Sequence, residues 1–384
     1  MQRIIYSTFN PDDVIDIHVH IAGPRSENDE MYYYSEKFEK SIVFEGIKLV
    51  TKLNNSNMTG PRYVSVLYNQ IRESRYVEKI VLLGLDQVYT EDGRAEKEKT
   101  HLFVSNDYLR NLSQIYPEFL FGCSVHPYAP KALERLWQCA AEGAVLCKWL
   151  PSAQSIDPTH PLAVRFYRAL SELGLPLLIH VGPEDAIPSS MNKEDELLVN
   201  AAAGKYGNNA GDAIVMALEE KATVIVAHSA LPLGKFFDKD NDYWEQTFHL
   251  LLQRVKQADN IPLYADTSAF CLPGRFKYME KIIPLAQEMP YRFLYGSDYP
   301  TPIVSLKSKR VEDILDAFGW LAERAFPTND LDKNHQLLQP HFPPQMFTAA
   351  AKVLRNPNND VPNLDKYLRR LGVKKRRLFW FLGN

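Results

Sequence analysis

The sequence has few cysteines, no strong excess of charge and no long apolar run. Its four cysteines show no Cys-x-x-Cys spacing, which argues against a zinc ribbon and against a dithiol redox site. The net charge is −3, so electrostatics gives no reason to expect nucleic acid or an anionic membrane as a partner. A small-molecule substrate is the better expectation, and the sequence leaves open whether the chain forms a homo-oligomer.

Signals for export and membrane insertion are also missing. No apolar run approaches the roughly 20 residues of a membrane span. The opening residues MQRIIYSTFNPDD lack the basic start, apolar core and small-residue cleavage site of a secretory signal. We therefore expect a cytoplasmic location.

What the sequence does contain is a series of short runs rich in Val, Ile and Leu. Each run is nearly continuous rather than alternating, and polar residues or glycine end it, which is typical of parallel strands covered on both sides. The eight runs lie at 14–20, 79–86, 119–127, 144–151, 176–182, 223–229, 262–268 and 292–300.

Helical segments separate these runs. Two of them, 129–143 and 160–174, end at Gly143 and Gly174, where helix stops are expected. Alternating strands and helices predict an α/β fold with a parallel sheet. Eight strands favour closure into a (β/α)8 TIM barrel, although pattern alone also allows an open, doubly wound sheet.

Two regions exceed a minimal barrel. We expect one domain over residues 1–384, with a core of about 12–320, a helical insertion at 21–78 and a C-terminal helical extension at 325–384. The insertion follows the first strand, so we predict that it covers part of the active face and offers aromatic side chains to the substrate.

The first predicted strand ends in His18 and His20. Alternate residues of a strand point to the same face, so these imidazoles project together. An isolated His-x-His can simply cap a strand, but polar side chains also occur at the ends of four other runs, where barrel enzymes build their sites. These side chains are Lys148, His180, His228 and Asp298. Imidazole and carboxylate ligands suit Zn, Fe, Mn, Ni or Co, and zinc is the metal we expect.

The segments IDIHVHIAGP, IHVG, VAHS and LYGSDYP resemble the amidohydrolase superfamily, specifically its amidohydrolase-related branch of metal-dependent hydrolases and decarboxylases. The resemblance extends over roughly residues 12 to 320. It implies a distorted TIM barrel of the metallo-dependent hydrolase type, with His18, His20, His180 and Asp298 as metal ligands. It also implies that His228 binds a second metal or polarises the substrate.

Lys148 allows three interpretations. In two-metal relatives a lysine on the fourth strand is carboxylated and bridges the metals, whereas this branch more often resembles one-metal enzymes. A free Lys148 would instead contact the substrate or another site residue, or it would be a structural charge at the barrel rim. The cofactor we expect is one divalent ion, with a second only if Lys148 is carboxylated.

The expected chemistry follows from this ligand set. A metal acidifies water, Asp298 accepts the proton and passes it to the leaving group, and His228 donates a hydrogen bond to the oxyanion. Loop residues at the same end of the barrel are weaker candidates for substrate binding. They are Arg25, His126, Tyr128, His160 and Glu184.

The sequence therefore predicts a metal-dependent hydrolase of a small amide, ester or lactone. A decarboxylase or hydratase acting on an unsaturated or aromatic acid is the alternative. It needs a clamp for the substrate carboxylate, which Arg25 or Lys148 would supply. A non-catalytic barrel that serves as a binding module is a third interpretation, but no ligand of the set is missing.

Overall fold

The computed structural model describes residues 7–21, 31–54, 58–182, 186–192, 194–196, 213–232, 241–257, 260–272, 275–301 and 329–373. Eight parallel strands form the central sheet, and all eight lie within the runs that the sequence predicts. In sheet order they are β1 (Ile15–His20), β3 (Lys79–Leu83), β5 (Phe119–Cys123), β6 (Leu146–Trp149), β7 (Leu177–Ile179), β8 (Val224–Val226), β9 (Leu263–Asp266) and β10 (Phe293–Leu294).

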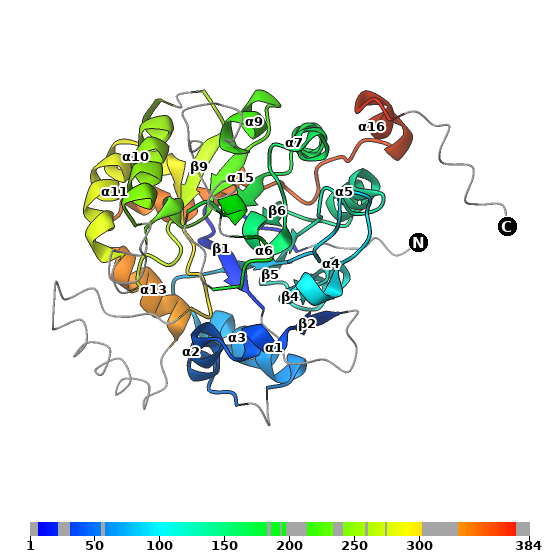
Figure 1. The fold of residues 1–384 in the computed structure, drawn as a ribbon. Helices are drawn as coiled ribbons and strands as arrows, with labels where there is room; N and C mark the ends of the chain where they lie inside the picture. Colours follow the sequence, from blue (N-terminus) through cyan, green and yellow to red (C-terminus); the bar gives the residue numbers. More distant parts are fainter. Residues whose placement is uncertain are drawn as a thin grey trace.

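Hydrogen bonds between the two ends of this sheet complete the ring. The Ile17 amide donates to the Tyr295 carbonyl at 3.1 Å, and the His20 amide donates to the Tyr299 carbonyl at 2.8 Å. The strands thus form a barrel surrounded by helices (Figure 1). This confirms the predicted (β/α)8 barrel over the open sheet.

The outer helices connect successive strands. They are α4 (Asn106–Ile115), α5 (Ala132–Ala141), α7 (Pro161–Leu173), α9 (Ala213–Glu219), α10 (Asn241–Gln257) and α11 (Phe276–Glu288), with a short α6 (Pro151–Gln154) after β6. Helix α7 ends where predicted, because Gly174 adopts a left-handed conformation with φ 60°. Gly143, with φ 95°, follows α5 in the same way.

The insertion after β1 is largely helical, as predicted. It contains β2 (Tyr32–Tyr34), α1 (Glu36–Glu39), α2 (Ile42–Thr51) and α3 (Gly60–Glu73). Strand β2 pairs antiparallel with β4 (Leu102–Val104). Figure 1 shows α1, α2 and α3 grouped together at one side of the barrel.

The C-terminal extension closes the N-terminal end of the barrel. It comprises α13 (Asp330–Leu338), α14 (Pro344–Thr348), α15 (Ala350–Val353) and α16 (Leu364–Arg370). Ala349, Ala350 and Leu354 pack with Ile15 and Ile17 inside the ring of strands. The opposite end of the barrel is therefore left for the site. Within the described residues, the structure contains no helix that combines the length and the apolar character of a membrane span.

Candidate metal centre

The polar side chains predicted from the strand ends line one cavity at the C-terminal end of the barrel. His18 and His20 come from β1 and Lys148 from β6, while His180 follows β7 and Asp298 follows β10. His228 lies just after β8, in the 3₁₀ turn Ala227–Ala230, where it adopts a left-handed conformation with φ 52°. The register of the parallel strands brings these six residues together, although up to 280 positions separate them in the sequence.

The spacing of three of these side chains suits a bound ion. Asp298 Oδ1 lies 3.3 Å from His20 Nε2 and 3.6 Å from His18 Nε2. Two ligands of a tetrahedral ion, each bonded at about 2.0–2.2 Å, lie about 3.3–3.6 Å apart. The two distances from Asp298 Oδ1 therefore already match a tetrahedral metal, and the three ligand atoms all lie within 4.8 Å of one another.

A second group of possible ligands shares His18. Among the described residues, His18, His228 and Asp266 also bring one ligand atom each within 4.8 Å of one another. His180 belongs to neither group, but it lines the same cavity, and its ring centroid lies 5.2 Å from that of His228. All six metal-ligand assignments, those of His180 and Lys148 included, stay predictions.

Asp298 is held in place from both sides. Its amide donates to the His18 carbonyl at 2.9 Å, and the Thr301 hydroxyl donates to Oδ2 at 2.7 Å. Burial acts to raise the pKa of Asp298, but the hydrogen bond from His20 and the interactions with His18 and Thr301 outweigh it and lower the pKa below its usual value. The carboxylate is therefore ionised at neutral pH.

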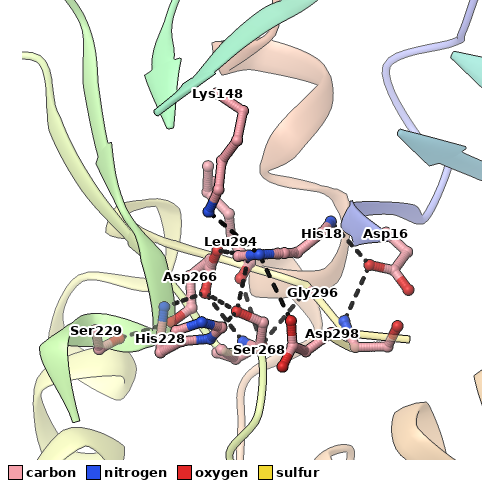
Figure 2. Close-up of polar contacts among 12 residues, drawn as sticks. Asp16, His18, Lys148, His228, Ser229, Asp266, Ser268, Leu294, Gly296 and Asp298 are labelled. Carbon is pink, nitrogen blue, oxygen red and sulfur yellow. Dashed lines mark hydrogen bonds and ion pairs between the residues drawn. The ribbon is translucent and has the colours of Figure 1, made fainter. Parts of the chain in front are cut away.

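Asp266 and Ser268 organise two of the imidazoles (Figure 2). Asp266 Oδ2 lies 2.7 Å from His18 Nδ1, and Asp266 Oδ1 accepts hydrogen bonds from the His228 amide at 2.7 Å and from the Ser268 hydroxyl. Burial raises the pKa of Asp266, whereas the hydrogen bonds from Ser268 and His228 and the charge of Lys148 act to lower it. As a carboxylate, Asp266 only accepts, so His18 then donates from Nδ1. The lone pair of a neutral His18 then resides on Nε2, which faces Asp298.

The same reasoning applies to His228. The single proton of the Ser268 hydroxyl goes to Asp266, so the oxygen is left to accept from His228 Nδ1 at a distance of 2.8 Å. Nε2 of a neutral His228 then carries its lone pair as well. We call this arrangement, from His228 through Ser268 to Asp266 and His18, the tautomer relay.

Burial keeps the imidazoles neutral. It lowers the pKa of His18, His180 and His228 well below the usual value, and the positive charge of Lys148 lowers all three further. Lys148 Nζ lies 3.4 Å from His18 Nε2. Neutral imidazoles are the form that binds metals. Donor chemistry, spacing and protonation state together show that these residues fit a divalent metal.

The walls of the cavity are mainly apolar. Its volume is about 330 Å³, near the lower end of the range for small-molecule sites. The insertion supplies one wall, with Phe38 of α1 and with Ile42, Val43, Gly46 and Ile47 of α2. This confirms that the insertion borders the active face.

A profile of the amidohydrolase family matches residues 15–333. The chain belongs to the amidohydrolase family. Its members are enzymes of the amidohydrolase superfamily, so the resemblance drawn from the sequence is confirmed. Comparison with the curated proteins finds no match.

Comparison with solved structures returns matches that extend over most of this chain. A probable 2-pyrone-4,6-dicarboxylic acid hydrolase from Acinetobacter baumannii has 15% identity and a TM-score of 0.47, and the match covers 85% of this chain and 99% of that chain. 2,6-Dihydroxybenzoate decarboxylase from Rhizobium has 12% identity and a TM-score of 0.42, and the match covers 86% of this chain and 99% of that chain. 4-Oxalomesaconate hydratase from Rhodopseudomonas palustris has 14% identity and a TM-score of 0.40, and the match covers 88% of this chain and 98% of that chain.

Three of the predicted substrate-binding residues of this amidohydrolase lie together but outside the cavity lining. The ring centroid of Tyr128 lies 4.9 Å from that of His126 and 4.8 Å from that of His160. His126 Nε2 lies 2.8 Å from the Gln154 carbonyl, and His160 caps α7 by accepting from the Leu162 amide. Their contacts are structural, and their role in substrate binding stays a prediction. Arg25 and Glu184 lie outside the described residues.

Sequence reasoning missed four buried polar residues near the site. Asp266 stands near the end of the predicted run 262–268, as the other candidates do in theirs, so its position was a usable signal. Ser268 follows it by two positions. Asp16 accepts from the amides of His18 and Ser297, and burial raises the pKa of Asp16 to about 7. Arg275 lines the cavity from a loop, where no sequence pattern marked it.

Proposed function

We propose that the chain is a metal-dependent hydrolase, with zinc as its metal, that activates water for attack on a small amide, ester or lactone. The observation that carries this proposal is the placement of an ionised Asp298 between His18 and His20 on the floor of a largely apolar cavity. These three residues, with His228 as a further ligand from the same cavity lining, would hold the ion, which when bound would acidify water and polarise the carbonyl group. We propose one ion, with a second only if Lys148 is carboxylated, in a cytoplasmic enzyme.

Asp298 acts as the general base. Its lowered pKa leaves it free to accept a proton at a carboxylate oxygen, and the Thr301 hydroxyl and the His18 carbonyl hold it in position. It then donates that proton to the leaving group as the tetrahedral intermediate collapses. The apolar wall limits the access of bulk water during these transfers.

The tautomer relay separates the roles of His228 and Lys148. With Nδ1 donating to Ser268, the neutral His228 presents an acceptor at Nε2, which suits a metal ligand better than a donor to the oxyanion. Lys148 lines the same cavity, and its charged ammonium group has three hydrogen-bond donors and no acceptor. In the one-ion form we therefore propose Lys148 as the donor that stabilises the oxyanion.

A decarboxylase or hydratase acting on an unsaturated or aromatic acid is the second candidate. The observation that favours it is the presence of two cationic side chains in the lining, Lys148 and the buried Arg275. Such side chains bind carboxylates by charge-assisted hydrogen bonds. Among the described residues, Arg275 is therefore a further candidate to bind the substrate carboxylate.

Product analysis separates the candidates. The zinc-loaded protein is incubated with lactones, esters and amides in one series and with aromatic and unsaturated acids in another, and mass spectrometry and CO2 release are recorded. Ring opening or ester cleavage that disappears in an Asp298→Asn variant of equal metal content supports the hydrolase. Release of CO2 or addition of water to a double bond, without hydrolysis, supports the second candidate. Binding of substrates without any turnover would overturn both.

A further inference from the structure

The cavity has two ends of different character. The ionisable lining residues gather at the floor, around His18 and Asp298. The wall formed by α2 presents only Ile42, Val43, Gly46 and Ile47, while Glu45 and Lys48 of the same helix do not line the cavity. A substrate whose reactive group reaches the floor must therefore place its remaining atoms against apolar surface.

Helix α2 is held firmly enough to act as a wall. Ser41 caps its N-terminus by accepting from the Phe44 amide at 3.2 Å. Phe44 points away from the cavity into the core of the insertion, where its ring centroid lies 4.9 Å from that of Tyr34 and 5.7 Å from that of Phe38. The cavity face of α2 is thus positioned by packing on its opposite face.

Gly46 is the unusual residue of this wall. Glycine in a helix interior is destabilising relative to alanine, because the unfolded chain has more freedom to lose. Residues 42, 43, 46 and 47 lie on one side of the helix, since positions four apart share a face. A side chain at position 46 would consequently extend into the cavity, between Ile42 and Val43, and reduce its depth.

We propose that the α2 wall is a subsite for an uncharged alkyl or aryl arm of the substrate and that Gly46 sets the length of arm that fits. This inference rests on the proposed function for the reactive end of the substrate. Sugars, nucleotides and other substrates with many polar groups do not fit, because those groups would lose hydrogen bonds to water on this wall. The substrate class is a carbonyl compound with one reactive polar end and an apolar remainder.

The test measures binding of a chain-length series. Straight-chain alkyl hydroxamates from acetohydroxamate to octanohydroxamate are titrated by calorimetry into the zinc-loaded protein. Affinity should rise about fourfold per methylene group until the wall is covered. Gly46→Leu should weaken the longest members about 15-fold to 60-fold more than it weakens acetohydroxamate, which corresponds to two or three lost methylene groups.

Glu45→Leu is the matched control, because it adds the same side chain to α2 at an exposed position that does not line the cavity. Circular dichroism verifies that both variants fold. A wild-type affinity that does not depend on chain length, or an identical response of the two variants, would overturn the subsite.

A second series without a metal-binding group keeps this test separate from the proposed function. The 1-alkanols from butanol to octanol are titrated by NMR chemical shift. If acetohydroxamate fails to bind, the metal end and the proposed function are wrong, but alkanol binding that lengthens with the chain and weakens in Gly46→Leu still supports the subsite. Alkanols that bind the wild type and both variants equally would refute it.

Discussion

Removing the Ser268 hydroxyl should weaken metal binding although Ser268 is no ligand. In the structure, the Ser268 oxygen lies 2.8 Å from His228 Nδ1, and its hydroxyl donates to Asp266. In Ser268→Ala, the buried Nδ1 of His228 loses this acceptor. The imidazole can then move its proton to Nε2, where it blocks the lone pair that a metal needs.

The size of the effect follows from the role of such partners. Loss of a hydrogen-bond partner that orients a metal ligand typically costs 10-fold to 100-fold in metal affinity, or about 1.4–2.7 kcal/mol. Asp266→Asn should fall at the upper end of this range or beyond, because Asp266 also accepts from His18 Nδ1 at 2.7 Å. Ser268→Thr keeps a hydroxyl and should retain most of the affinity.

Zinc affinity is measured by competition with a chromophoric chelator at fixed pH, and ¹⁵N NMR of the metal-free protein reports which nitrogen of His228 carries the proton. Ser229→Ala is the matched control, since the buried Ser229 hydroxyl donates to the backbone carbonyl of Asp266 and not to its carboxylate. If Ser268→Ala and Ser229→Ala lower the affinity equally, or if the His228 tautomer is the same in wild type and Ser268→Ala, the tautomer relay is refuted.

Two further predictions concern Asp298 and His126. Asp298→Asn should preserve the fold but lower kcat by about 10²–10⁴, the usual contribution of a general base. A steady-state assay, with the metal content measured in parallel, tests this. A variant that keeps both its metal and its turnover would contradict the assignment of Asp298 as the base. Burial lowers the pKa of His126 from 6.5 to about 4, so on acidification the unfolded chain takes up this proton first. The contribution of His126 to stability should be complete above pH 6.5 and should fall by about 3 kcal/mol as the pH drops to 4. Urea unfolding at several pH values should show this loss in the wild type but not in His126→Gln, and parallel pH profiles of the two proteins would contradict it.

The fold was largely predictable because its signals are local. Strands covered on both sides need continuous apolar side chains, so each of the eight strands is visible as a run in the sequence. Gly143 and Gly174 marked helix ends because a left-handed residue favours glycine. Closure of the barrel has no such local signal, since its hydrogen bonds run from Ile17 and His20 to residues after the last strand, almost 280 positions away.

The sequence by itself determined which residue types stand at the strand ends, and with them His18, His20 and Asp298 as a candidate metal site. Only the tertiary structure decided which partners orient these side chains. Ser268 and Asp266 act on His18 and His228 because β1, β8 and β9 end around the same point of the barrel, and no local pattern encodes that distance. The α2 wall likewise depends on how the insertion packs over the barrel. Strand periodicity fixes the direction of a side chain along its own segment, whereas contacts between segments depend on the register and closure of the whole barrel.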